Sequence, residues 1–231
     1  MKSSFHRSAL PTVRSDSRDY GPAQAWDNPI YADAAVLIGQ LFRATASRKD
    51  DGTFARIHDS PIALTGGRSA STSWGDYDND GDLDLFVANG GGLNNELYRN
   101  DGGGVMNRVT YGSIVTDGGY SNHSVWVDYD NDGDLDLYVS NLFGVNFLYA
   151  NHGENGFTRI EGDPLTEITT SSYSSAWGDY DGDGDLDAFV ANGYDATNHL
   201  FRNDGNGNHW LRLKLVGTTS NRSALGATVR A

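Results

Sequence analysis

The sequence predicts an all-β fold built from β-propeller blades. Three observations support this prediction: an acidic motif led by Trp recurs three times, alternating apolar residues follow each copy, and turn-forming residues separate the segments. The copies occupy residues 74–89, 126–141 and 177–192, so that their first residues lie 52 and 51 positions apart. A period of about 50 residues is typical of propeller blades of four strands each.

Within each repeat, the apolar residues indicate short strands. After the first acidic loop, Leu83, Leu85 and Val87 occupy every second position, which is the period of a strand. A second strand is expected over residues 96–99, and a further extended segment over residues 157–160 of the next repeat. Turns rich in Gly and Asn, which tolerate positive φ, separate these segments. We therefore expect about four strands per repeat and no amphipathic helix.

The predicted organisation has three parts. Residues 1–36 form a poorly defined lead-in or a degenerate fourth repeat around Trp26, in which we expect no metal site; residues 37–207 hold the repeats; residues 208–231 begin a small β module. Three complete repeats are fewer than the four to eight blades that close a propeller, so we expect a partial propeller and a chain that is a fragment of a longer protein.

Composition and charge restrict the classes of function. The 231 residues include 17 Lys and Arg against 31 Asp and Glu, and this net charge of −14 argues against a nucleic-acid-binding surface. The absence of Cys excludes a disulfide scaffold and a thiolate metal site. No run of 18 apolar residues occurs, so no membrane insertion is expected. Residues 1–20 lack the apolar core of a secretory signal peptide, which fits the expectation of a fragment.

The negative charge is concentrated in three loops of nine residues, 76–84, 128–136 and 179–187. Without their Asp residues the net charge would be +1 instead of −14. Each loop has Asp at positions 1, 3, 5, 7 and 9 and Gly at position 6, which allows a sharp bend. We expect the side chains at positions 1, 3, 5 and 9 and the carbonyl at position 7 to bind metal. The candidate ligands are Asp76, Asp78, Asp80, Asp82, Asp84, Asp128, Asp130, Asp132, Asp134, Asp136, Asp179, Asp181, Asp183, Asp185 and Asp187.

A hard cation would offset the repulsion among these carboxylates. Two unit charges ~5 Å apart repel by roughly 3 kcal/mol at an effective dielectric constant near 20. Calcium accepts six to eight oxygen ligands, and the loops contain no His or Cys that would favour zinc or copper. We therefore predict about three Ca²⁺ ions, one per loop, which would change the formal net charge from −14 to −8. Magnesium and a purely solvated, turn-forming loop are the alternatives.

An EF-hand shares the first half of this pattern but does not fit the second half. Its twelfth position requires a bidentate Glu, whereas here these positions hold Val87, Val139 and Val190. The residues that follow each loop also alternate as in a strand, where an EF-hand requires a helix. We therefore do not expect these loops to be EF-hands.

The run from Trp74 to Leu85, followed by Leu97-Tyr98-Arg99-Asn100, resembles the FG-GAP/VCBS repeat of integrin α-subunit propellers and bacterial surface proteins. Residues 208–217 and 220–227 are similar to the opening of an ASPIC/UnbV domain, a combination that resembles the cartilage acidic protein group. These resemblances imply a calcium-binding propeller located outside the cell or at its surface.

Two functions of different classes are compatible with this sequence. The first is an extracellular or cell-surface binding and adhesion module whose ligand is an unknown protein or carbohydrate. The alternative is the propeller domain of an enzyme that acts on polysaccharides. We expect the first, and no enzyme, because the chain has no recognisable catalytic motif. The loops at 90–95, 141–146 and 192–198 differ between repeats and are the expected ligand-facing positions.

Overall fold

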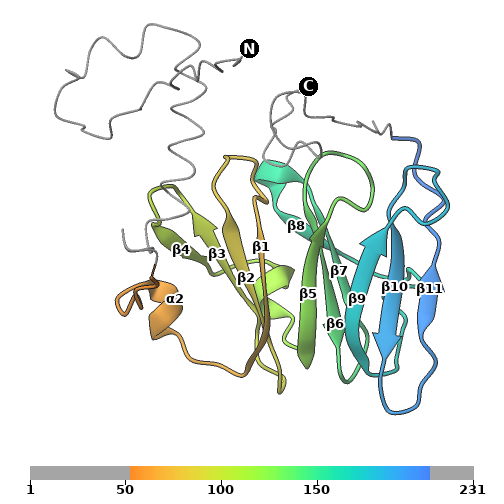
Figure 1. Ribbon diagram of the computed structural model, residues 1–231, viewed down its shortest axis with the longest axis horizontal. Helices are drawn as coiled ribbons and strands as arrows, with labels where there is room; N and C mark the ends of the chain where they lie inside the picture. Colours follow the sequence, from red (N-terminus) through yellow and green to blue (C-terminus); the bar gives the residue numbers. More distant parts are fainter. Residues whose placement is uncertain (1–52, 209–231) are drawn as a thin grey trace, which may run out of the picture. The chain divides into compact units, whose positions relative to one another are not determined.

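The computed structural model describes residues 53–208, which form three antiparallel sheets side by side (Figure 1). Each sheet runs in chain order from an inner strand outward. The first sheet consists of β1 (Ser69–Gly75), β2 (Asp84–Asn89), β3 (Glu96–Asn100) and β4 (Met106–Val109). The second consists of β5 (Ser121–Val127), β6 (Asp136–Asn141), β7 (Phe147–Asn151) and β8 (Phe157–Ile160). The third consists of β9 (Ser172–Gly178), β10 (Asp187–Asn192) and β11 (His199–Phe201).

These sheets confirm the predicted all-β fold of propeller-type blades. In every blade the acidic loop joins the first strand to the second, and the Trp of the motif pairs across the ladder, as Trp74 does with Leu85. The first strand of each blade carries a register shift at the far end of the same ladder, between Ser69 and Ser71 in the first blade. Within the described range the sheets do not close into a ring.

Short helices occur where we expected none. Two single-turn α-helices, α2 (Pro61–Leu64) and α3 (Ser113–Thr116), precede the inner strands of the first and second blades, and a 3₁₀ turn spans Gly153–Asn155. Helix α3 buries Ile114 and Val115 between the first two blades. Four residues are too few to show helical periodicity in the sequence, which is why the pattern of apolar residues did not predict these turns.

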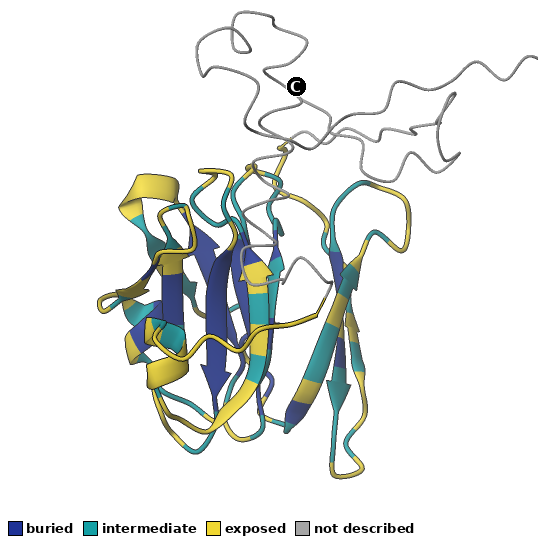
Figure 2. Ribbon diagram, turned by 60° about the vertical axis from the view of Figure 1, so that its left-hand side comes forward, coloured by how far each residue is buried: buried dark blue, intermediate teal, exposed yellow. Residues whose placement is uncertain are grey.

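The core lies between the blades. Phe86, Ala88 and Leu97 of the first blade pack against Leu137 and Val139 of the second, all of them buried. Between the second and third blades, the buried cluster is formed by Tyr138, Leu148, Ile168 and Val190. Figure 2 shows that buried residues follow the strands and that exposed residues are concentrated in the connections. A further buried cluster, Leu85, Val87, Tyr98 and Met106, lies on the other face of the first blade against Ile62 of α2. Elsewhere the blades depend on their neighbours for burial, as expected for a repeat architecture.

The outer face of the first blade is partly covered by α2, whereas that of the third blade is more exposed than the faces between blades. Phe189 and Leu200 occupy the positions of the buried Phe86 and Leu97, but Leu200 is 58% exposed because no described segment packs against it. Trp74, at the opposite end of the stack, is 57% exposed. The exposed aromatic and aliphatic side chains thus lie where further blades would pack.

Several predictions from the sequence fall outside the described residues. They concern the lead-in or degenerate repeat at residues 1–36 and, apart from Asn208, the module predicted at 208–231. In the third blade, the place expected for a fourth strand also lies beyond residue 208. Within the part of the chain that is described, no helix is long and apolar enough to cross a membrane.

Candidate metal centre

The last position of each acidic loop is fixed by strand pairing. Asp84, Asp136 and Asp187 are the first residues of β2, β6 and β10, and each pairs with the residue after the Trp of its repeat. The preceding eight residues form a loop between the two strands and return to this point. Because strand pairing places position 9 beside the end of the first strand, the start and the end of the loop lie close together.

In all three loops, the carboxylates at positions 1, 3 and 9 converge. One oxygen from each of the three side chains lies within 4.8 Å of the others. The three groups, in chain order, are Asp76, Asp78 and Asp84; Asp128, Asp130 and Asp136; and Asp179, Asp181 and Asp187. The first and second loops have identical burial, with two half-buried carboxylates and one buried one. The same geometry has thus formed three times from the same residue spacing.

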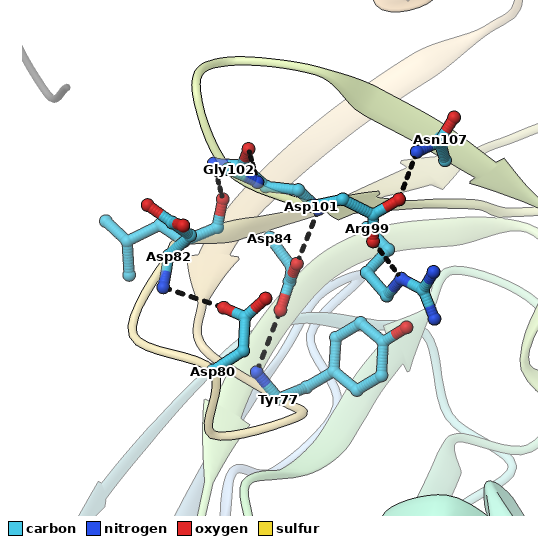
Figure 3. Close-up of polar contacts among 10 residues, drawn as sticks. Tyr77, Asp80, Asp82, Asp84, Arg99, Asp101, Gly102 and Asn107 are labelled. Carbon is cyan, nitrogen blue, oxygen red and sulfur yellow. Dashed lines mark hydrogen bonds and ion pairs between the residues drawn. The ribbon is translucent and has the colours of Figure 1, made fainter.

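The position 9 carboxylate is buried and held by two backbone N–H groups. Asp84 accepts a hydrogen bond on Oδ2 from the Tyr77 N–H at 3.0 Å and one on Oδ1 from the Asn100 N–H at 2.8 Å (Figure 3). The corresponding donors to Asp136 are Tyr129 and Asn151, and those to Asp187 are Tyr180 and Asn203, at 2.8–3.1 Å. These bonds orient the carboxylate, and they tie the loop to residues in or just after the third strand of the blade.

Position 1 organises the turn. Asp76 accepts hydrogen bonds from the backbone N–H groups of Asp80 at 3.1 Å and Gly81 at 3.0 Å, and Asp128 does the same in the second loop. Gly81 has φ of 92°, in the region that favours glycine, and the glycines at this position in the other loops have φ of 94° and 100°. The sharp bend that the sequence predicts at position 6 is therefore present in each loop.

The carboxylates at positions 5 and 7 lie outside the convergent groups. Asp80 Oδ1 accepts a hydrogen bond from the Asp82 N–H at 2.8 Å (Figure 3), and the other two loops repeat this contact. The residues concerned are Asp80, Asp82, Asp132, Asp134, Asp183 and Asp185. Binding of metal through their side chains or carbonyls remains a prediction from the sequence. The structure thus divides the fifteen candidate ligands into nine that converge and six that brace the loop.

The electrostatics of the first two loops favour a cation. Burial raises the pKa of Asp84 and of Asp136 to about 7, against the opposing effect of the two backbone N–H groups on each. Burial also raises the pKa of Asp76 and Asp78, with repulsion from Asp80 adding to it. Oxygen Oδ1 of Asp78 is buried and has no hydrogen-bond partner among residues 53–208. These carboxylates are thus partly removed from water, and the nearby Arg99, which is itself ion-paired with Asp101, offsets only part of the rise in the pKa of Asp78.

The chemistry of the donor set fits a calcium-type ion. It consists of oxygen atoms alone, the negative charge exceeds what the local N–H groups neutralise, and an acceptor inside the group is unpaired. Hard cations such as Ca²⁺ and Mg²⁺ prefer such ligands, whereas zinc and copper prefer His and Cys. Three carboxylates that can supply six oxygens, together with nearby carbonyls and water, meet the coordination number of calcium more easily than the strict octahedron of magnesium.

The structure assigns a role to residues that sequence reasoning left without one. Asn100 and Asn151 are the last residues of β3 and β7, Asn203 lies two residues after β11, and the backbone N–H groups of all three donate to the position 9 carboxylates. The signal was present in the sequence, because an Asn follows the Leu-aromatic pair in every repeat. Its partner could not be inferred, since the contact spans 15 or 16 residues and depends on how the third strand pairs.

Comparison with known proteins agrees with the repeat pattern. The family model described as FG-GAP-like repeat matches residues 76–139 and, a second time, residues 128–190. Each match begins at the first Asp of an acidic loop and ends in the second strand of the following blade, and together they include all three loops. No curated protein matches the chain. Residues 76–190 of this chain are therefore FG-GAP-like repeats.

Proposed function

We propose that this chain is a calcium-binding module of β-propeller blades whose role is binding or adhesion rather than catalysis. One observation carries the calcium assignment: three carboxylates converge in each of three loops, and the first loop contains a buried acceptor oxygen, Asp78 Oδ1, without a partner. When bound, calcium would neutralise the converging carboxylates. The residues that would hold it are those at positions 1, 3 and 9, with further oxygens from positions 5 and 7 as the sequence predicts.

Metal binding and folding are expected to be linked, because only the folded loop brings these oxygens together. A direct test is calorimetric titration of the chelator-treated protein with calcium, with thermal melts before and after. We expect about three sites and a large rise in melting temperature. A protein that melts cooperatively without calcium and binds none would refute the assignment. Parallel titration with magnesium distinguishes the two hard cations.

The proposed location is extracellular or at the cell surface. It rests on the resemblance of the repeats to FG-GAP/VCBS propellers and of residues 208–231 to the opening of an ASPIC/UnbV domain. Extracellular modules bind calcium with dissociation constants of about 10⁻⁴–10⁻³ M. Five Asp residues per loop make affinities in this range or tighter the expectation for such a setting.

The ligand-binding face is proposed at the end of the blades opposite the metal loops. There the loops at 90–95, 141–146 and 192–198 follow the second strand, whereas the acidic loops precede it. Their ends are fixed, because in each loop a terminal Asn side chain accepts a hydrogen bond from the last N–H of the second strand. Between these fixed ends each loop exposes one large apolar side chain: Leu93, Phe143 or Tyr194.

Exposed aromatic rings at this end support a protein or carbohydrate ligand. Tyr120 lies edge-on to Phe143 at 5.2 Å between ring centroids, and Tyr173 lies similarly against Tyr194 at 5.9 Å. Aromatic rings that are exposed but held by a neighbour suit recognition because little side-chain entropy is lost on contact. Screening on a glycan and surface-protein array, repeated with Phe143→Ala and Tyr194→Ala, tests this face. Binding that both variants retain in full would contradict it.

A further inference from the structure

Asn151 contacts two metal loops at once. Its backbone N–H donates to Oδ1 of Asp136, the position 9 carboxylate of the second loop, at 2.8 Å. Its side-chain Nδ2 donates at 2.7 Å to the carbonyl of Tyr77, which lies between two converging carboxylates of the first loop. The side chain is almost completely buried, so water competes little with these bonds.

Asn203 repeats this arrangement one blade later. Its N–H donates to Oδ1 of Asp187 in the third loop at 2.9 Å, and its Nδ2 donates to the carbonyl of Tyr129 in the second loop at 2.7 Å. Tyr129 in turn donates its N–H to Oδ2 of Asp136 at 3.1 Å. The carbonyl and the N–H of one tyrosine therefore connect a neighbouring blade to the position 9 carboxylate of its own loop.

Together these bonds form one continuous line through the three loops. In order along the line, the residues are Asp84, Tyr77, Asn151, Asp136, Tyr129, Asn203 and Asp187. A second contact runs parallel to it: the side-chain amide of Asn79 donates to Asp134 at 2.7 Å, and that of Asn131 donates to Asp185 at 2.6 Å. Adjacent loops are thus joined at two points, once directly between loop residues and once through the Asn that follows in the chain.

We propose that this line couples the metal sites, so that occupancy of one loop raises the calcium affinity of the next. This inference rests on the proposed calcium-binding function. A carboxylate held by a metal ion can no longer reorient, and it fixes the Asn N–H bonded to it. That Asn then fixes the peptide group of the Tyr in the preceding loop. The converging carboxylates at positions 1 and 3 of that loop lie on either side of this Tyr in the sequence. Part of the conformational entropy that the second site would lose on binding is therefore already lost when the first site is filled.

The test compares calcium binding by each site alone with calcium binding by two sites in the same protein. Loop 3 is disabled by Asp179→Asn with Asp181→Asn, which leaves loops 1 and 2. From this protein, loop 1 or loop 2 is disabled by the same substitutions at its positions 1 and 3, and each remaining site is titrated calorimetrically in 0.15 M salt. The product of the two single-site association constants is then compared with the overall constant of the two-site protein. Their ratio is the coupling factor.

We expect a coupling factor of about 5 or more, at the lower end of the range for coupled sites, which falls to near 1 in the Asn151→Ala background. Repulsion between the two ions is the same in both backgrounds, so the difference reports the side-chain bonds of Asn151, of which the bond to Tyr77 is the one that crosses between blades. A factor near 1 in the unaltered background, or one that Asn151→Ala leaves unchanged, would overturn the inference.

Asn100 supplies a matched control. It occupies the same place in the first blade, and its N–H donates to Asp84 at 2.8 Å, but its side-chain Nδ2 reaches, among the described residues, only the Leu83 carbonyl of its own blade at 3.2 Å. Asn151 makes the equivalent bond to Leu135 in addition to the one that crosses between blades. Asn100→Ala should therefore leave the coupling factor unchanged. A fall equal to that of Asn151→Ala would show that the bond within the blade is responsible.

Two arrangements keep the test decisive if Asn151→Ala unfolds. Asn203→Ala, at a less buried position, is examined in a protein that retains loops 2 and 3, with the same expected fall in coupling. Melting curves in chelator establish that each variant is folded. Absence of calcium binding in every folded variant would refute the proposed function itself, whereas independent binding by each loop would refute only the coupling.

Discussion

The indole ring of Trp126 lies directly against Gly75, so that a Cβ atom at Gly75 would meet the ring at 2.6 Å. Through this contact the second blade packs closely against the first. It lets the Trp126 Nε1–H donate to the Ser73 carbonyl at 3.2 Å, and it places the ring parallel to Tyr77 at 5.9 Å between centroids. Only glycine leaves room for this approach.

Gly75→Ala should therefore destabilise the protein. A methyl group at 2.6 Å from a packed ring forces the blades to shift, which typically costs about 1–3 kcal/mol. Gly178 is the matched control, because it follows the Trp of the third repeat and has open space around its Cβ direction. We expect Gly178→Ala to be neutral or slightly stabilising. Urea unfolding of both variants measures the difference, and equal stability would contradict the packing argument.

The second interface shows what happens without this glycine. Val127 stands where the first and third repeats have Gly75 and Gly178, and the Nε1–H of Trp177 is buried without a partner. A cavity of about 140 Å³ lies beside it, lined in part by Tyr129 and Phe201. Trp177 instead packs edge-on against Tyr138 at 5.5 Å. The fit between blades is thus looser where a side chain replaces glycine.

Two leucines at equivalent positions should respond differently to truncation. Leu148 is 1% exposed between the second and third blades, whereas Leu200 is 58% exposed on the outer face of the third. Leu148→Ala removes buried methyl groups and leaves a cavity, so we expect a loss of about 2–5 kcal/mol. Leu200→Ala should change stability by less than about 0.5 kcal/mol. Thermal or denaturant unfolding distinguishes them; a large loss for Leu200→Ala would mean that another segment covers this face.

Much of the fold could be predicted from the sequence because its signals are local. The acidic motif sets the start of the second strand, alternation marks its length, and Gly81 marks the bend of the loop. The hydrogen bond between Asn151 and Tyr77 could not be predicted, because it joins residues 74 positions apart and depends on the offset between blades. Helix α3 was missed for a different reason: one turn is too short to leave a periodic pattern.

The sequence predicted where the candidate metal sites lie, but not which of their carboxylates converge and which shape the loop. The sequence predicted side-chain ligands at positions 5 and 9 alike, yet Asp84 is buried as the first residue of a strand while Asp80 accepts a bond from the loop backbone. Identical side chains acquire different roles because strand pairing fixes one end of the loop and Asx-type turns shape the rest. That distinction comes from backbone geometry, which the spacing alone does not contain.

Positions 3 and 7 of one loop should differ in their effect on calcium binding. Asp78→Asn removes a charge from the converging group and alters the carboxylate that has an unpaired oxygen, so we expect loss of one site. Asp82→Asn also removes one charge from the same loop, but it lies outside the group and retains its carbonyl. We expect it to preserve the number of sites. Calorimetric titration counts sites in both variants, and equal losses would point to net charge instead of geometry.

The pH dependence of stability should differ in the absence and presence of calcium. Burial raises the pKa of Asp84 and Asp136 to about 7, above the ordinary value of about 3.9 in an unfolded chain. Between these values the ion-free folded protein binds more protons than the unfolded chain, so its free energy of unfolding falls as pH rises. The stabilising contribution of these groups is therefore complete below about pH 4 and is lost as pH approaches 7. Calcium needs the ionised carboxylates, so its effect should grow over the same range.

Melting temperatures in chelator and in saturating calcium, measured from pH 5 to 8, test this expectation. In chelator the melting temperature should fall with pH, and the increment produced by calcium should rise. The Asn side chain in Asp84→Asn cannot ionise, so the variant should reduce the slope in chelator, with Asp136 supplying the remainder, even though the amide can accept only one of the two backbone hydrogen bonds. If the variant kept the full slope, the pH dependence would arise from general charge repulsion in this acidic chain and not from the buried carboxylates.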